Sequence, residues 1–211
     1  MKKLAYVFLI SLTAFSNIGY SQTTKGDMEV NAGWGTITGD GVFTVTKLLV
    51  TEIITSVFGD MHYTNVRTIG AAFMGYKYYF TDNAAVGMTG TYEAWKADLN
   101  YVSNGDKVGE YQRADITIAP ELTYNYLNDE WIRLYGSVGI GITFNSEKNT
   151  DKSTATNNYN TNDTHLNANL TALGLSAGKA LRGNLELGFG YKGLINLGIS
   201  YIFSNNKKEN P

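Results

Sequence analysis

The chain has 211 residues, of which 43% are hydrophobic, and this length and composition fit one folded domain rather than a disordered chain. It contains no cysteine, which excludes disulfide frameworks and cysteine-based zinc sites. The formal net charge of −2 at pH 7 gives no reason to expect nucleic acid as a partner.

The first 21 residues have the layout of a secretory signal peptide. Two lysines follow the initial methionine, and Leu4–Phe15 is a mostly apolar run. A membrane-spanning helix needs about 20 apolar residues, so this run is too short to be one. Gly19 and Ser21 are small residues at positions −3 and −1 of a cleavage site. Cleavage after Ser21 would leave 15 basic and 19 acidic residues, a net charge of −4.

After this leader, apolar and polar residues alternate in stretches that turn-rich gaps separate, which is typical of strands with two different faces. The clearest stretch, Tyr111–Leu127, is much longer than an average strand in soluble proteins, which has about five or six residues. The expected strands are Met28–Thr38, Ala72–Phe80, Ala84–Ala94, Tyr111–Leu127, Trp131–Asn145, His165–Leu181, Leu185–Lys192 and Ile195–Phe203. The alternation in the sixth stretch fails near Leu173, which indicates either a bulge or a fault in that assignment.

Between the first two strands, the segment Val42–Phe58 is open to two interpretations. Five of its apolar residues fall at helical spacing, and Gly59 could end a helix. Its many β-branched residues are instead compatible with an extra hairpin and a barrel of ten strands. Strict alternation fails twice inside the segment, which favours a helix in the first extracellular loop.

The gaps between strands alternate in length. Three are predicted to be tight turns, Thr81–Asn83, Asn128–Glu130 and Arg182–Gly183. Three are long, Gly39–Asn65, Val102–Gly109 and Ser146–Thr164, and the last of these contains a polar run, Asn149–Thr164, that need not pack. The short gap at Lys192–Gly193 breaks the rule. Short periplasmic turns and long outer loops are typical of an all-β, eight-stranded, antiparallel up-and-down transmembrane β-barrel.

Aromatic residues on the apolar faces gather at both ends of the strands, as expected where rings meet lipid headgroups. Those at the periplasmic end are Tyr78, Phe80, Tyr124, Tyr126, Tyr201 and Phe203, and those at the opposite end are Tyr92, Phe144, Phe189 and Tyr191. A closed barrel also leaves no unpaired backbone group in lipid. We therefore expect outer-membrane lipid to be a partner of the chain.

The last strand resembles the C-terminal assembly signal of outer-membrane β-barrel proteins, which has a polar residue, then glycine, then aromatic or apolar residues. The residues that carry this resemblance are Asn196, Gly198, Tyr201 and Phe203. The whole stretch from Met28 to Phe203 resembles the small outer-membrane protein β-barrel family, akin to outer-membrane proteins X and A. The resemblance implies recognition by the barrel-assembly machinery and residence in the outer membrane of a Gram-negative cell.

The expected organisation is a signal peptide at 1–21, a barrel at 22–203 and a polar tail at 204–211. Eight residues follow Phe203, whereas members of the family commonly end at the aromatic residue. We expect no peptidoglycan-binding domain after the barrel, so the anchoring role of larger relatives is not expected here. The chain is expected to be a monomer.

Catalytic residues are scarce in this sequence. Only His62 and His165 could act as imidazole bases, and neither has an acid partner at a persuasive spacing. Two histidines without cysteine make a poor metal site. We therefore predict no enzyme activity, no metal and no cofactor, although some small barrels are lipid-modifying enzymes.

Eight charged residues are expected to point into the barrel, four of each sign. They are Lys77, Glu93, Arg113, Asp115, Glu121, Arg133, Glu186 and Lys192. Following each strand from its periplasmic turn gives a lower layer of Lys77, Arg133, Glu186 and Glu121 and an upper layer of the other four. Each layer has two charges of each sign, so we expect the charges to pair and the lumen to be closed, because eight strands leave room only for side chains.

Three functions remain open from the sequence. The favoured one is a structural or surface-interaction barrel whose loops contact an extracellular partner of unknown identity. The alternatives are a narrow channel or transporter, which balanced lumen charges disfavour, and a lipid-modifying enzyme, which the scarcity of bases disfavours.

Overall fold

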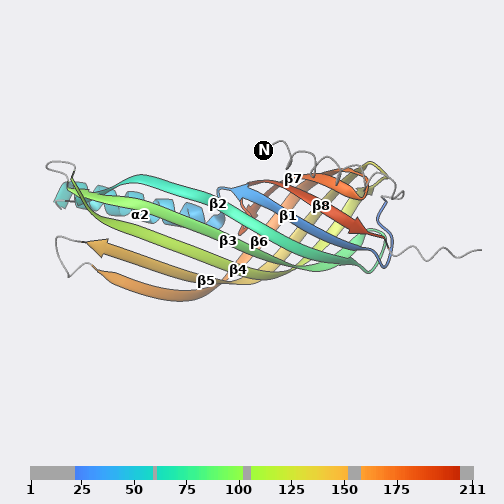
Figure 1. Cartoon of the computed structure of the whole chain (residues 1–211), viewed down its shortest axis with the longest axis horizontal. Helices are drawn as coiled ribbons and strands as arrows, with labels where there is room; N and C mark the ends of the chain where they lie inside the picture. Colours follow the sequence, from blue (N-terminus) through green and yellow to red (C-terminus); the bar gives the residue numbers. More distant parts are fainter. Residues whose placement is uncertain (1–21, 59–60, 102–105, 152–157, 205–211) are drawn as a thin grey trace, which may run out of the picture.

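The computed structural model of the protein describes residues 22–58, 61–101, 106–151 and 158–204 (Figure 1). The expected signal peptide, residues 1–21, lies outside the described residues. The same holds for the polar tail beyond residue 204 and for Gly59, the residue expected to end the helix.

Eight antiparallel strands pair in sequence order, and β8 pairs with β1 to close a barrel. The strands are β1 (Met28–Thr36), β2 (Met61–Tyr79), β3 (Ala84–Tyr101), β4 (Lys107–Asn128), β5 (Ile132–Asp151), β6 (Tyr159–Gly178), β7 (Leu181–Gly190) and β8 (Ile195–Phe203). The predicted eight-stranded barrel is confirmed. The ten-stranded alternative is wrong, because residues 39–58 form helix α2 (Gly39–Phe58) instead of a hairpin.

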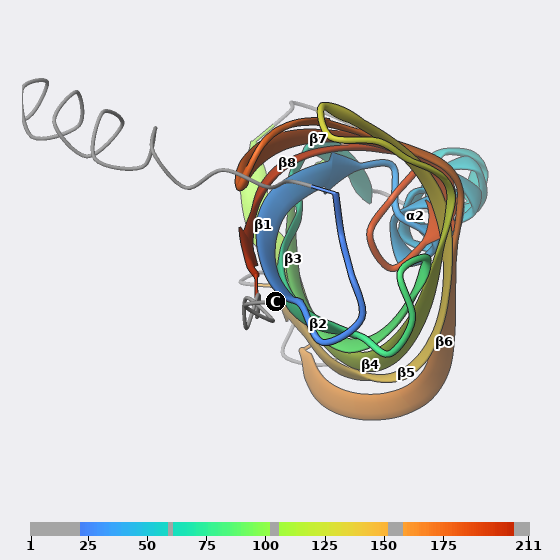
Figure 2. The same ribbon diagram turned by 90° about the vertical axis from the view of Figure 1, so that its right-hand side faces the viewer.

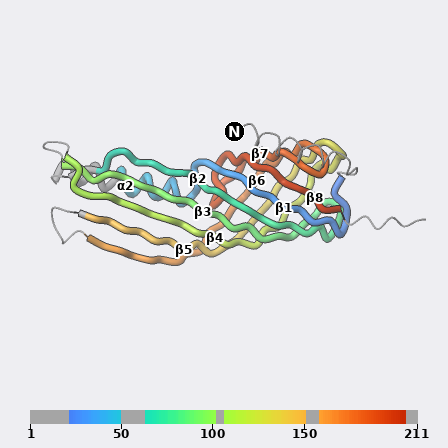
Figure 3. The backbone as a smooth tube through the Cα atoms, viewed as in Figure 1, coloured from blue at the N-terminus to red at the C-terminus, as the bar shows by residue number. Residues whose placement is uncertain are grey.

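The strands fall into two classes of length. Strands β1, β7 and β8 have 9 or 10 residues, whereas β2 to β6 have 18 to 22. All eight strands are paired only up to the level where Gly35 lies opposite Ala71 and Gly190 lies opposite Asn169. We call this part the ring. Beyond it, the five long strands continue as a curved sheet, the extension, at the left of Figure 3.

The extension corrects the prediction of long, unpacked outer loops. Most of the predicted loop Ser146–Thr164 is a continuation of β5 and β6, in which Asn149 pairs with Tyr159. Likewise β2 begins at Met61 and β4 at Lys107, inside segments expected to be loops. Backbone hydrogen bonds between strands need no apolar face, so a run of Asn and Thr can extend a hairpin without an apolar core.

The two faces of the ring differ as the alternation predicts. The outward residues of β4, such as Ile118, Leu122 and Tyr126, are exposed, while the inward Thr117 and Glu121 are buried. The irregularity near Leu173 is a bulge, because the register between β6 and β7 shifts between Thr171 and Leu173. An apolar exterior around a polar interior is the reverse of a soluble protein and fits a barrel that lipid surrounds.

One predicted turn is misplaced. Arg182 and Gly183 lie inside β7, and the chain turns at Lys179 and Ala180 instead. Gly178, in the left-handed region with φ of 132°, ends β6 before this turn.

Helix α2 follows β1 directly and lies at one side of the barrel (Figure 2). Thr38 caps it by accepting a hydrogen bond from the Gly41 amide at 2.8 Å. Ile37, just before the cap, has a φ of 55°, which is strained for a β-branched residue. Leu48 is buried in a small apolar cluster with Ala97 and Tyr111 of the extension. Within the described residues, no helix has the length and hydropathy that crossing a membrane requires.

Candidate functional site

The lower half of the ring, toward the short turns that are expected to face the periplasm, is filled by a cluster around Arg133. Its guanidinium donates to Glu29 at 2.7 Å and to the Tyr79 hydroxyl at 2.7 Å, and Tyr79 in turn donates to Glu29 at 3.0 Å. Arg133 and Glu29 each have 1% of their side chains exposed. The Lys77 ammonium lies 4.9 Å from the centroid of the Tyr135 ring. Desolvated charges at this depth require partners, and Glu29 and Tyr79 supply them to the two terminal nitrogens of Arg133, whereas its Nε has no hydrogen-bond partner among the described residues.

A second cluster centres on Lys192. Its ammonium lies 3.3 Å from Glu121 and 3.2 Å from Glu186, so one cation bridges two carboxylates. Tyr191 donates to Glu121 at 2.7 Å and Tyr135 donates to Glu186 at 2.7 Å. All five side chains are buried, so this cluster crosses the lumen from β4 to β7.

The turn between β7 and β8 explains two corrections. Tyr191 was expected in the outer aromatic belt, but only 2% of it is exposed and it points into the lumen. Lys192 was expected in the upper layer, but it pairs with the two carboxylates assigned to the lower layer. Gly190 and Gly193 have φ of 132° and 105°, and these left-handed glycines let the turn fold inward instead of continuing the strand alternation.

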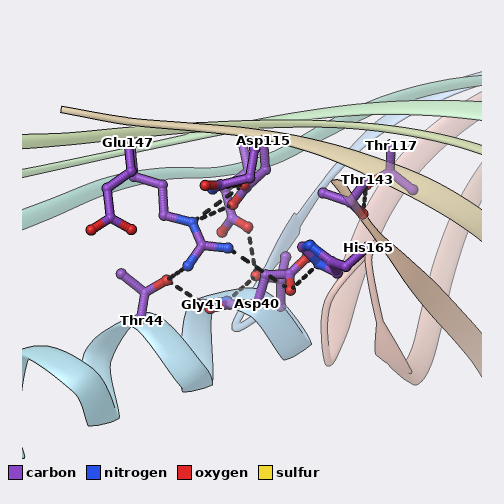
Figure 4. A network of polar contacts seen from close by, with 12 residues as sticks. Asp40, Gly41, Thr44, Asp115, Thr117, Thr143, Glu147 and His165 are labelled. Carbon is purple, nitrogen blue, oxygen red and sulfur yellow. Dashed lines mark hydrogen bonds and ion pairs between the residues drawn. The ribbon is translucent and has the colours of Figure 1, made fainter. Parts of the chain in front are cut away.

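The upper end of the ring carries a third cluster, where α2 meets the extension (Figure 4). Arg113 donates to Asp115 at 2.9 Å and to the Thr44 hydroxyl of α2 at 2.6 Å. Glu93 accepts from the Thr38 hydroxyl at 2.6 Å. Of the four charged residues predicted for the upper lumen, Glu93 and Arg113 therefore hold the start of the helix in place, and Asp115 supports Arg113.

Asp40, in the first turn of α2, is the centre of the remaining contacts. It accepts from the Asn167 amide at 2.6 Å, lies 3.1 Å from Nε2 of His165 and lies 3.9 Å from Arg113. Its position near a helix N-terminus also favours the negative charge. Figure 4 shows Asp40 and Thr44 on the helix facing Asp115 and His165 on the strands.

Sequence reasoning missed two carboxylates of these clusters. Glu29 lies in β1, where Met28 and Val30 are exposed on either side of it, and this alternation could have revealed it as a lumen residue. Asp40 gave no such signal, because it comes from the helix and reaches the lumen only through the way α2 docks. With it, the upper cluster has three carboxylates, Asp40, Glu93 and Asp115, around the guanidinium of Arg113.

The predicted assembly-signal residues all lie in β8. Asn196 is buried in the lumen, and Gly198 pairs with Gly33 of β1. The rings of Tyr201 and Phe203 stack edge to face with centroids 4.7 Å apart at the periplasmic end of the barrel. Their role in assembly stays a prediction.

The acid–base chemistry available is limited. Contrary to the sequence analysis, His165 does have an acid partner, Asp40. No described serine or threonine hydroxyl is hydrogen-bonded to His165, so the serine–histidine arrangement of an acyl-transfer site is incomplete there. His62 is in β2, but its side chain lies outside the described part. No group of three metal-ligating side chains is found among the described residues.

Comparison with known proteins supports the fold. No protein-family model and no curated protein matches the sequence. Among solved structures, the outer membrane protein OprG from Pseudomonas aeruginosa matches with a TM-score of 0.52 and 13% identity, over 88% of this chain and 99% of that chain. The N-terminal β-barrel domain of OprF from the same organism matches with a TM-score of 0.47 and 14% identity, over 85% and 98%.

The attachment invasion locus protein Ail of Yersinia pestis matches with a TM-score of 0.43 and 13% identity, over 85% of this chain and 100% of that chain. Sequence identity this low supports a similarity of fold and nothing about function. The chain has the fold of the small, eight-stranded outer-membrane β-barrels, as the resemblance of its last strand implies.

Proposed function

We propose that the protein is an outer-membrane scaffold with a closed lumen, and that its extension meets partners outside the cell. The observation that carries this proposal is the Lys192 cluster. A cation held between Glu121 and Glu186 crosses the interior of an eight-stranded ring, where the space is only wide enough for side chains.

The Arg133 cluster blocks the same lumen closer to the periplasmic turns. Opening a water path would require breaking ion pairs such as Arg133–Glu29, both of which are buried. Separating such a pair would leave two desolvated charges without their partners, which disfavours opening. This argues against the channel alternative.

The extension supports the surface role. Five strands and a helix of 20 residues continue beyond the ring, at the end of the barrel opposite the short turns. The outer part of β6, from Tyr159 to Thr164, is exposed along its length. A rigid sheet that projects from a membrane anchor presents residues to partners at little entropic cost.

The experiment compares a deletion strain, its parent and the complemented strain. We expect deletion to change surface behaviour, measured as cell aggregation and adhesion, and complementation to restore it. We expect uptake of small solutes and the composition of outer-membrane lipids to stay the same. A loss of solute uptake that complementation reverses would favour the channel. A change in lipid composition that complementation reverses would favour the enzyme.

A further inference from the structure

A groove of about 1070 Å³ opens beside the first turns of α2. It exists because β7 ends at Gly190, opposite Asn169, while β6 continues outward from Ala168 to Tyr159. Within the described residues, that edge of β6 pairs with no strand, and α2 faces it instead. The groove therefore passes over a strand edge and joins the inside of the barrel to its outside.

One wall of the groove is apolar and belongs to the lipid-facing exterior. Its residues include Ile140, Leu166, Leu170, Phe189 and, from α2, Phe43. Leu166 is 78% exposed and Phe43 is 72% exposed, which makes them the two most exposed large apolar side chains of the described chain. Burying apolar side chains that are this exposed in a concave surface against an apolar ligand is favourable in free energy.

The other wall is polar and adjoins the upper cluster. Asp40, Arg113, Glu147, His165 and Asn167 line it. Sites for small molecules commonly combine a mostly apolar lining with a few convergent polar groups, at volumes of about 300–1,000 Å³. The two walls thus match the two ends of one amphipathic molecule.

The charges around the polar wall disfavour an anionic group. Both cations are already neutralised, since Arg113 is bonded to Asp115 and Lys47 lies 2.6 Å from Glu147. Asp40 and the exposed Asp163 add negative charge. Burial acts to raise the pKa of Glu147, but hydrogen bonds from Lys47 and Tyr159 outweigh it and hold that pKa below its usual range. The wall is therefore net negative at neutral pH.

The depth of the groove fits entry from the membrane. Phe189 and Phe144 are outward aromatic residues of the outer belt, where rings meet headgroups. Phe189 lines the groove itself, so the apolar wall lies at the level of the outer leaflet and the polar wall lies just inside it.

We propose that this groove binds a single-chain amphiphile with a cationic or uncharged head, taken from the outer leaflet. The alkyl chain lies against Leu166, Leu170 and Phe189, and the head lies among Asp40, His165 and Asn167. This inference goes beyond the scaffold function and holds whether or not the extension has a protein partner.

The test uses the full mature chain in phosphatidylcholine nanodiscs and dodecyl amphiphiles with a photoreactive diazirine near the chain end. Three heads are compared: trimethylammonium, maltoside and carboxylate. Crosslinked peptides are mapped by mass spectrometry. We expect labelling by the first two probes to concentrate on the lining segments of β6 and β7. We expect the carboxylate probe to reach half-saturation only at about tenfold higher concentration, which corresponds to about 1.4 kcal/mol of binding free energy.

A matched pair of variants locates the site. Ala168 is exposed on β6 and lines the groove, so Ala168→Trp should fill it and lower labelling there by about tenfold. Ala114 shares the outward face of β4 with the exposed Ile116 and Ile118 and does not line the groove, so Ala114→Trp should leave labelling unchanged. Excess unlabelled dodecyl maltoside should compete at the groove in the wild type, which provides a readout that needs no variant.

Labelling spread evenly over the lipid-facing surface, with no effect of Ala168→Trp or of the competitor, would show that the groove is not a binding site. Labelling at the groove that is strongest with the carboxylate probe would overturn the assignment of the head.

Discussion

Replacing Arg133 by alanine should strongly destabilise the barrel although Arg133 does not touch lipid. The guanidinium makes bonds of 2.7 Å to Glu29 and to Tyr79, and its removal leaves the Glu29 carboxylate with only the Tyr79 hydroxyl as a donor. Because Glu29 is 1% exposed, the stranded charge should cost about 3–5 kcal/mol of unfolding free energy. Removing both charges, in Arg133→Met with Glu29→Gln, should restore most of this loss, since a neutral isosteric pair strands no charge.

The assay is equilibrium urea unfolding in phospholipid vesicles, followed by the fluorescence of the three tryptophans. Lys179→Ala is the control, because it removes a cation 3.3 Å from Glu130 in an exposed pair at the periplasmic turn, and such pairs contribute about 0–1 kcal/mol. The reasoning fails if Arg133→Ala costs no more than Lys179→Ala, or if the double variant is as unstable as the sum of its two single variants.

Three further predictions concern the lipid face, the assembly signal and the entry to the helix. Ile118→Arg should cost about 2–4 kcal/mol in the same unfolding assay, whereas Ile118→Leu should cost less than about 1.5; equal costs would mean that Ile118 does not face lipid. Tyr201→Ala with Phe203→Ala should lower the yield of heat-modifiable protein in the outer-membrane fraction, and an unchanged yield would remove these residues from the assembly signal. Ile37→Gly should stabilise the barrel by about 1 kcal/mol, because φ of 55° is strained for isoleucine; destabilisation would contradict that strain.

The sequence predicts the ring well because lipid on one side and packed polar groups on the other impose a strict alternation. The same alternation loses its phase near Leu173, which the sequence leaves open between a bulge and a wrong assignment, and the register shift there shows that it is a bulge. The helix was recognisable because two adjacent pairs of apolar residues within 42–58 do not fit a strand.

The errors arise where side chains no longer alternate between lipid and lumen. Tyr191 continues the apolar face of β7 in the sequence, but the glycine on its N-terminal side turns the chain inward. The hairpin that pairs Asn149 with Tyr159 lies in the extension, which the proposed function places outside lipid, where neither face needs to be apolar. Asp40 enters its cluster through tertiary docking of α2, which leaves no periodic trace in the sequence. The groove beside β6 depends on where β7 stops, and no local pattern encodes it.

Single-channel recording in planar bilayers tests the closed lumen most directly. Purified wild-type protein, inserted at a verified density, is held under voltage while the current is recorded. The Lys192 and Arg133 clusters predict a flat baseline without reproducible steps, because both cross the lumen with paired, buried charges. Reproducible, long-lived conductance steps in the wild type would contradict the closed lumen and make the protein a channel.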